Sequence, residues 1–418
     1  MKARQAAFHT LDGVINHRRT LNTLLTQYKN HVVPPDQALY QALVYGTLRQ
    51  YRALLALSAA MMRKPPATAG HPLSIIINLG LYQLLAMNLG DHGVINETVN
   101  LAAHNKQIRA KGLINAILRR VQRERSAWQM RLKQADELNL PEWLRGRYPE
   151  QQAGIAAVNS SPPPLTLRLA HTHDRTAWLN AHGNARANPL HAQAITLHSG
   201  SNVQHIPGFL GGDISVQDAA AQQAATLLHP QNGERLLDAC AAPGGKTGHI
   251  LELAPECHLL ALDQDEERLV RVQENLARLH LHAELCVADA ANPAAWWDGK
   301  PFDAILLDAP CSGSGVLRRH PDIGWLRSDE DLQNLAAQQQ HLLDKLWPTL
   351  KQEGRLLYTT CSILEEENQH NIAAFLAAHP DAYLQPLTLP ACIDTGYGSL
   401  HLPDDDGDGF YYAMLHKK

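Results

Sequence analysis

Residues 235–263 read RLLDACAAPGGKTGHILELAPECHLLALD, and this stretch decides the fold of the second half of the chain. Two apolar runs, LLDAC and HLLALD, have the length of buried strands, and a Gly-rich turn and a helical stretch lie between them. The alternation continues through AELCVAD, FDAILLD and GRLLYTTCS, with a long helical pattern starting at Ser328. Repeated strand–helix units predict an α/β domain with a parallel, doubly wound sheet.

Ligands of such sheets bind at the carboxyl ends of the strands, so the residues that close each strand are the candidate site residues. Four successive predicted strands end in or beside an aspartate, and the fifth ends in TTCS (359–362). A single aspartate is explained equally well as the cap of the following helix. Four at one edge favour a binding site; they are Asp238, Asp263, Asp289 and Asp308.

The turn after the first of these strands reads DACAAPGGKT (238–247). Gly244 and Gly245 allow the backbone to approach a ligand closely. A Walker phosphate loop would need a glycine where Cys240 stands, and the chain has no GxGxxG motif. An adenosyl ligand without phosphates fits better, with Asp263 at the ribose hydroxyls and Asp289 toward the adenine.

Six cysteines occur at positions 240, 257, 286, 311, 361 and 392, and none forms a CxxC pair. We therefore predict neither a metal site nor a disulfide framework.

An ordinary cysteine is a small buried hydrophobe, but Cys311 and Cys361 directly follow the fourth and fifth predicted strands, beside the ligand turn. Two thiols suit methylation of cytosine at C5: one adds to C6 and makes C5 nucleophilic, and a second group assists release. A protonated Asp308 near N3 could assist the addition. This chemistry alone does not decide which cysteine attacks.

The rest of the chain has a different character. The first 125 residues show helical periodicity, in segments such as 38–57, 73–87 and 95–122, and predict a helical bundle. After Pro162-Pro163-Pro164, possible strands at 164–170 and 213–218 surround a short helix near 174–182. We therefore predict three parts: a helical domain over 1–129, a linker helix and small α+β subdomain over 130–230, and the α/β domain over 231–418.

Charge is distributed unevenly along the chain. Residues 1–150 contain 20 Lys and Arg against 9 Asp and Glu, whereas the remainder contains 17 against 32. Such asymmetry is consistent with a basic arm that binds a polyanion, although a charged helix surface is often simply solvated.

The start of the chain lacks the apolar run of a signal peptide, and the most apolar stretch, 73–87, is short for a membrane span. We expect a cytoplasmic protein without a membrane partner.

Five motifs of the second half resemble those of the RsmB/Sun (Fmu) group of RNA 5-methylcytosine methyltransferases. They are DACAAPGGKT, ALDQDEERL, VADA, LLDAPCSGSGV followed by RRHPDIGW, and YTTCS followed by EEEN. The N-terminal segments AFHTLDGVI, LVYGTLRQ, IINLGLYQLLAM, INETVNLA and KGLINAILRR resemble the RNA-binding NusB-like domain attached to this group, and GDGFYYAML is similar to its closing strands. The resemblance spans nearly the whole chain and implies a Rossmann-like methyltransferase domain behind a NusB-like bundle.

The resemblance also implies roles for individual residues. Cys361 would be the nucleophile, and Cys311 would support proton removal or enzyme release. Asp308 would assist at the base, and Lys246 would face the active site. S-adenosylmethionine would be bound by Cys240, Ala241, Ala242, Pro243, Gly244, Gly245, Lys246, Asp263, Asp289 and Asp308.

The substrate implied by the family is a cytosine of 16S ribosomal RNA that has not yet been assembled into the subunit. Two alternatives stay open: the same chemistry on transfer RNA or another ribosomal site, and a non-catalytic RNA-binding or antitermination factor. The pair Cys311 and Cys361 argues against the second alternative, because a scaffold needs neither thiol. The sequence does not establish an oligomeric state, and a monomer is the favoured expectation.

Overall fold

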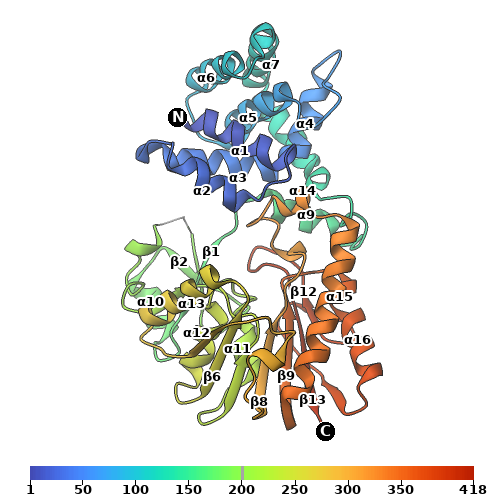
Figure 1. The fold of residues 1–418 in the computed structure, drawn as a ribbon. Coiled ribbons are helices and arrows are strands. Elements are labelled where there is room, and N and C mark those ends of the chain that lie inside the picture. The colour runs from blue at the N-terminus through green and yellow to red at the C-terminus, as the bar shows by residue number, and fades with distance from the viewer. Residues whose placement is uncertain (199–201) are drawn as a thin grey trace. The chain divides into compact units, whose positions relative to one another are not determined.

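The computed structural model describes residues 1–198 and 202–418. The chain forms two compact units, one containing Met1–Pro163 and Leu317–Ser328, the other Pro164–Val316 and Asp329–Lys418 (Figure 1). The division of the chain at residues 129 and 230 stays a prediction.

The first unit is helical, as predicted. Its central helix, α5, is apolar on every side and is therefore buried by the helices around it. The outer helix α7 is amphipathic, with Ile114, Ile117, Leu118 and Val121 buried. The helices of this unit are α1 (Ala3–Ile15), α2 (Leu21–Lys29), α3 (Gln37–Arg49), α4 (Tyr51–Ala60), α5 (Pro72–Ala86), α6 (Asp91–His104), α7 (Lys111–Arg123), α8 (Arg125–Gln134), α9 (Gln152–Ser160) and α14 (Ile323–Leu326).

Two predicted helical segments are each interrupted. The segment 38–57 breaks at Gln50, where φ is −105° and ψ is 10°, so that α3 and α4 are separate helices. The Gln50 side chain donates a hydrogen bond to Ser160 O (3.1 Å). The segment 95–122 breaks between α6 and α7, where Lys106 has a positive φ of 59°. The apolar periodicity continues across both breaks, and neither contains a proline, so the sequence does not mark them.

The segment Leu317–Ser328 packs within the helical unit although it follows the LLDAPCSGSGV motif in the sequence. Its Asp322 Oδ2 accepts a hydrogen bond from Leu21 N (2.9 Å). Arg52 Nη2 donates to Gly324 O (2.6 Å), and the guanidinium lies 4.2 Å from the centre of the Trp325 ring. These contacts fix α14 against the helices that precede it in the chain.

The second unit contains a nine-stranded sheet in the order β11-β12-β13-β9-β8-β5-β6-β7, with β10 paired to β13. Neighbours among β5 to β9 are parallel, whereas β13 is antiparallel to β9. The strands are β5 (Arg235–Asp238), β6 (His258–Asp263), β7 (Glu284–Val287), β8 (Phe302–Asp308), β9 (Leu350–Thr360), β10 (Ala382–Gln385), β11 (Cys392–Asp394), β12 (Ser399–His401) and β13 (Phe410–Lys417). All five predicted strands of the doubly wound sheet are confirmed.

Helices cover both faces of this sheet (Figure 1). On one face lie α11 (Gln223–Leu228), α12 (Gly245–Leu253) and α13 (Glu266–Arg278); on the other lie α15 (Asp329–Leu346) and α16 (Gln369–Ala378). The chain runs outward from β5 to β7 and then returns to β8 on the other side of β5. The order therefore reverses beside β5, which is where doubly wound sheets bind ligands.

A smaller antiparallel sheet has the order β2-β3-β1-β4. Its strands are β1 (Leu165–Leu169), β2 (Ala185–Ala187), β3 (Ala194–Leu197) and β4 (Ile214–Val216), with α10 (Arg175–Ala181) between β1 and β2. The two strands and the helix predicted here are confirmed as β1, β4 and α10. Across the described part of the chain, no helix is long and apolar enough to cross a membrane.

Candidate active site

The Gly-rich turn leads from β5 into α12. Gly244 has a φ of +95°, and a Cβ at this position would lie 3.0 Å from Val272 Cα, so both the conformation and the packing require glycine. Asp238 is buried beneath the turn and accepts a hydrogen bond from Thr247 Oγ1 (2.7 Å). Burial raises the pKa of Asp238 to about 7. Asp238 therefore supports the turn from below.

Two further strand-end aspartates lie beside this turn. The Asp263 carboxylate at the end of β6 is buried and accepts hydrogen bonds from Ala242 N (3.2 Å) and Asp265 N (3.0 Å). Asp289 follows β7 and is exposed, with Oδ1 accepting from Ala291 N (2.9 Å). Each carboxylate keeps lone pairs that can accept from ligand hydroxyl or amino groups.

Lys246 and Asp308 form an ion pair of 2.6 Å at the end of β8. Lys246 Nζ also lies 5.2 Å from the centre of the Phe410 ring. Burial acts to lower the pKa of Lys246, but the Asp308 carboxylate opposes this effect, and the pKa ends above its usual value. Lys246 Nζ donates a hydrogen bond to Asp308 Oδ2 within this pair. The role of Asp308 as the acid near N3 stays a prediction.

The two cysteines at the strand ends lie together. Cys311 Sγ and Cys361 Sγ are 3.2 Å apart, and the loops that carry them are joined by a hydrogen bond from Gly315 N to Cys361 O (3.0 Å). The hydrogen bond to Cys361, followed by burial, raises the pKa of Cys311 well above its usual value. The two thiols therefore share one hydrogen bond, in which either sulfur can be the donor.

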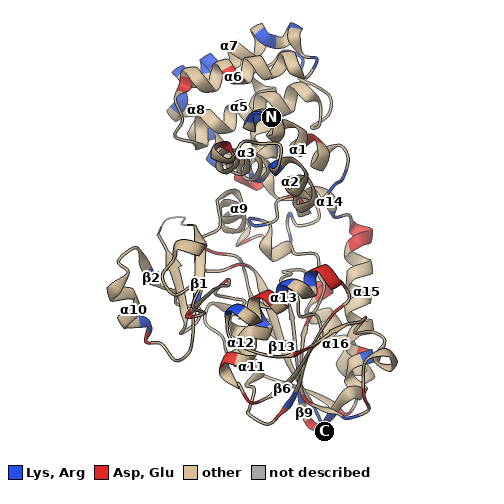
Figure 2. Cartoon of the chain, turned by 60° about the vertical axis from the view of Figure 1, so that its left-hand side comes forward, with Lys and Arg blue, Asp and Glu red and all other residues tan. Residues whose placement is uncertain are grey.

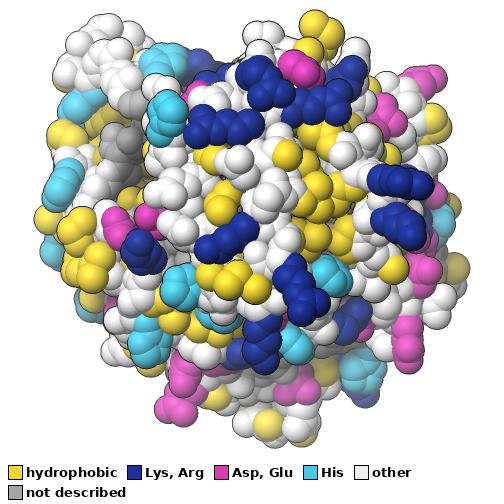
Figure 3. Space-filling model, turned by 90° about the horizontal axis from the view of Figure 1, so that it is seen from above, with side chains coloured by type: hydrophobic (Ala, Val, Ile, Leu, Met, Phe, Trp, Pro, Cys, Tyr) yellow, Lys and Arg dark blue, Asp and Glu magenta, His cyan; other side chains and the backbone are white. Residues whose placement is uncertain are grey.

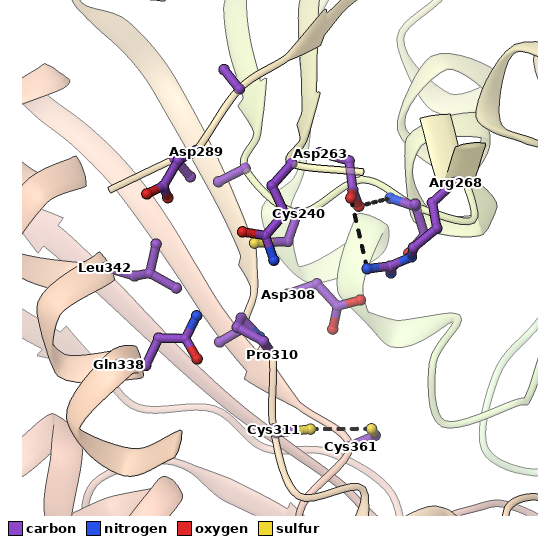
Figure 4. Close-up of a pocket in the computed structure, with 16 residues that line it drawn as sticks. Cys240, Asp263, Arg268, Asp289, Asp308, Pro310, Cys311, Gln338, Leu342 and Cys361 are labelled. Atoms are coloured by element: carbon purple, nitrogen blue, oxygen red, sulfur yellow. Dashed lines mark hydrogen bonds and ion pairs between the residues drawn. The ribbon is translucent and has the colours of Figure 1, made fainter. Parts of the chain in front are cut away.

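A cavity of about 230 Å³ opens at the carboxyl ends of β5 to β9, and both cysteines line it (Figure 4). Of the predicted cofactor residues, Cys240, Ala242, Asp263, Asp289 and Asp308 line this cavity. The others are not among the described residues that line it, although they belong to the same turn: Ala241, Pro243, Gly244, Gly245 and Lys246.

Several side chains near the cavity were not predicted. Arg268 of α13 donates to Ala242 O (3.1 Å) and lies 3.7 Å from Asp263 Oδ1. Gln338 and Leu342 of α15 line the cavity from the side opposite Arg268 (Figure 4). Glu367 is buried behind both cysteine loops. Helical periodicity could have placed Gln338 and Leu342 one turn apart on α15, but only the folded chain shows which strand ends they approach.

Within residues 1–198 and 202–418, no group of three or more His, Cys, Asp or Glu is arranged to hold a metal ion.

Two family models match the chain. The 16S rRNA methyltransferase RsmB/F model matches residues 225–416, and the NusB family model matches residues 1–123. Proteins named ribosomal RNA small subunit methyltransferase B from Yersinia pseudotuberculosis and Yersinia pestis are 43% identical over 426 aligned residues, covering 99% of this chain and 98% of theirs. The resemblance inferred from the motifs is confirmed.

Solved structures show the same fold. The crystal structure of PH0851 aligns over 100% of this chain and 99% of its own, with a TM-score of 0.76 and 22% identity. A methyltransferase homologue from Pyrococcus horikoshii aligns with 69% of this chain and 95% of its own, with a TM-score of 0.58 and 28% identity. With its NusB-like bundle, its Rossmann-like sheet and its full-length relatives, the chain belongs to the RsmB/F family of S-adenosylmethionine-dependent 16S ribosomal RNA methyltransferases.

Proposed function

We propose that this protein methylates C5 of a cytosine in 16S ribosomal RNA through a covalent bond between Cys361 Sγ and C6 of the base. The observation that carries the proposal is the thiol pair: Cys311 and Cys361 lie 3.2 Å apart on the wall of a cavity that also contains Asp308. C5 of cytosine is a weak nucleophile, and addition of a thiolate at C6 gives it enamine character, so that it can accept a methyl group.

The environments of the two cysteines support different roles. In the proposed reaction Cys361, which follows β9, is the nucleophile, and Cys311, whose pKa is raised, is the hydrogen-bond donor of the pair, in which either sulfur can donate. A donor at this distance stabilises the Cys361 thiolate both before attack and when the sulfur departs. We infer that Cys311 serves chiefly the release step, in which water accepts the C5 proton, the C5=C6 double bond re-forms, the C6–Sγ bond breaks, and the Cys311 thiol donates a hydrogen bond to the departing Cys361 thiolate.

The ion pair of Lys246 and Asp308 is proposed to act on the pyrimidine ring. Addition at C6 moves electron density toward N3, where a proton donor stabilises the product. Lys246 Nζ carries protons and is oriented by the carboxylate of Asp308, which lines the cavity. The Lys246–Asp308 pair thus supplies the acid; Asp308 was predicted for this role, and Lys246 was predicted to face the active site.

The lining of the cavity fits an adenosyl ligand. Asp263 and Asp289 offer carboxylate oxygens to ribose and adenine groups, and the thiol of Cys240, whose pKa is raised by burial, stays neutral beside the methionine end. The turn at Gly244 leaves no room for a side chain. When bound, S-adenosylmethionine supplies the methyl group; Cys240 to Lys246, together with Asp263, Asp289 and Asp308, would hold it.

The helical unit is proposed to bind the RNA. Helices α7 and α8 carry several Lys and Arg and fewer acidic residues (Figure 2). A space-filling view shows many Lys and Arg side chains exposed on the face that it presents (Figure 3). Contacts to phosphates position RNA without selecting its sequence. The target base must also leave any stack, which costs a few kcal/mol and least in unfolded RNA. We therefore propose cytoplasmic 16S RNA before assembly as the substrate.

The test is to incubate the protein with unmodified 16S RNA and radiolabelled S-adenosylmethionine, digest the RNA and identify the labelled nucleoside. We expect label in 5-methylcytidine at one position. Label in another nucleoside, or in transfer RNA alone, would overturn the proposed substrate. RNA binding without label on any RNA would instead support the non-catalytic alternative, against which the methyltransferase family already argues.

A further inference from the structure

A buried carboxylate joins the two cysteine loops from behind. Glu367 is fully buried in a short 3-10 helix, Glu365–Glu367, that follows β9. Its Oε1 accepts hydrogen bonds from Ser312 N (2.7 Å) and from Gln339 Nε2 (2.9 Å). Its Oε2 accepts from Ser312 Oγ (2.5 Å) and from Ser362 Oγ. Because Ser312 follows Cys311 and Ser362 follows Cys361, one side chain binds the neighbour of each reactive thiol.

Glu367 is itself held firmly in place. Tyr358 Oη of β9 donates to Glu367 O (2.6 Å). The adjacent Asn368 donates to Ser362 O (2.9 Å) and accepts from Thr360 Oγ1 (2.7 Å). These hydrogen bonds fix the 3-10 helix to β9. The Glu367 carboxylate, which binds Ser312, therefore holds the loop after β8 in a fixed position relative to β9.

Burying a carboxylate is costly unless donors surround it. Glu367 meets this condition with four donors, yet it is not among the described residues that line the cavity. It therefore contacts neither the base nor the cofactor in the proposed reaction. The contact it does make is between the loops that carry Cys311 and Cys361.

We propose that Glu367 is a positioning residue that holds Cys311 and Cys361 at hydrogen-bonding distance from each other. The inference rests on the proposed function for its catalytic meaning, but the positioning itself is independent of it. The charge acts in the same direction: after the hydrogen bond to Cys361, burial and the charge of Cys361, the Glu367 carboxylate adds to the rise in the pKa of Cys311. The same side chain thus places the Cys311 loop and makes a smaller contribution in favour of the protonated thiol.

The test compares Glu367→Ala, Glu367→Gln and the control Glu365→Ala. Glutamine can keep an oxygen toward Ser312 N and Gln339 while its amide donates to the two serine hydroxyls, so it removes the charge and preserves the contacts. Glu365 lies in the same 3-10 helix but is exposed. The full-length proteins are assayed for kcat and KM and, without RNA, for the rate at which diamide oxidises Cys311 and Cys361 to a disulfide, mapped by peptide mass spectrometry.

We expect Glu367→Ala to lower kcat about 100-fold, the cost of a misplacement of about 1 Å, with both KM values nearly unchanged. The disulfide should form about 10-fold more slowly in this variant, because sulfurs that lie apart must first meet. Glu367→Gln should recover much of the cross-linking rate and part of kcat. Glu365→Ala should match the wild type in every assay.

A folded Glu367→Ala protein with wild-type kcat and cross-linking rate would overturn the inference. If that variant does not fold, Ser362→Ala, which removes one of the four donors, replaces it; an unchanged cross-linking rate would then overturn the inference, and a slower rate would support it. A wild-type protein that makes no 5-methylcytidine would refute the proposed function alone, since the cross-linking rates still test the positioning.

Discussion

Two cysteines of identical chemistry acquire different properties from their neighbours. Both lie at strand ends and both line the cavity, so their positions in the sequence do not distinguish nucleophile from assistant. The pKa of Cys311 is raised, first by its hydrogen bond to Cys361 and then by burial. Either sulfur can donate in that hydrogen bond, so the choice of Cys361 as the proposed attacking group rests on the family resemblance.

Replacing the proposed nucleophile should remove the covalent chemistry altogether. We expect Cys361→Ala to lose methylation by at least about 1,000-fold and to form no adduct with RNA, because no other group can add to C6 in its place. The measurement is methyl incorporation together with a denaturing gel that retains covalent complexes. Cys286→Ser, in β7, serves as the matched control and should behave as the wild type. An adduct in Cys361→Ala would show that the roles are reversed.

Removing the second thiol should have the opposite effect on the adduct. Cys311→Ala retains the proposed nucleophile but lacks the thiol proposed to stabilise Cys361 as it leaves, so we expect RNA-bound protein to accumulate on the same denaturing gel. Turnover should fall about 100-fold while the first methyl transfer persists, as expected when only release is impaired. An inactive Cys311→Ala protein without an adduct would contradict the assignment.

At the scale of secondary structure, the turn between β5 and α12 is the most constrained element of the site. We expect Gly244→Ala to weaken binding of S-adenosylhomocysteine, measured by calorimetry. It should also lower the free energy of unfolding by about 1–3 kcal/mol, because the left-handed φ is strained for alanine and the Cβ meets Val272. Gly233 has a φ of +82° with nothing within 4 Å of a Cβ. Gly233→Ala should therefore show the conformational cost without the binding defect, and equal binding losses in both variants would refute this argument.

The same elements show what can be predicted from the sequence. Five parallel strands and the cysteines at their ends follow from short apolar runs, whose pattern is local. The break at Gln50 and the packing of Leu317–Ser328 with the helical unit depend on distant partners, such as Ser160 and Leu21, and leave no local pattern. Glu367 was missed for the same reason. Its run, EEEN, belongs to a motif of the family, but its donors lie on three other segments, so the sequence does not show that Glu367 is buried between the cysteine loops.

At the scale of the whole molecule, the excess of Lys and Arg in the N-terminal half includes an exposed cluster of arginines on α7 and α8. Exposed Arg120 and Arg123 lie at the end of α7, and Arg131 lies on α8. The guanidinium groups of Arg120 and Arg131 lie 5.4 Å and 4.6 Å from the centre of the Trp128 ring, so these two basic side chains are held close together. A cluster of this kind suits a phosphate backbone, and its arginines can also stack on exposed bases.

We expect the triple variant Arg120→Gln, Arg123→Gln, Arg131→Gln to bind 16S RNA more weakly and with less dependence on salt. The slope of log K against log[salt] is negative, and each phosphate contact contributes about −0.7 to it for single-stranded RNA. Loss of three contacts should therefore reduce the magnitude of the slope by about 2. Filter binding at several salt concentrations measures this slope.

The charge-matched control changes Lys300, Lys351 and Lys418 to Gln. Lys300 and Lys351 lie near the amino ends of β8 and β9, away from the cavity. If both triple variants lose the same slope, RNA binding depends on net charge rather than on this cluster. If kcat in the arginine variant stays at the wild-type level under saturating RNA, the cluster contributes affinity and the strand-end residues contribute the chemistry.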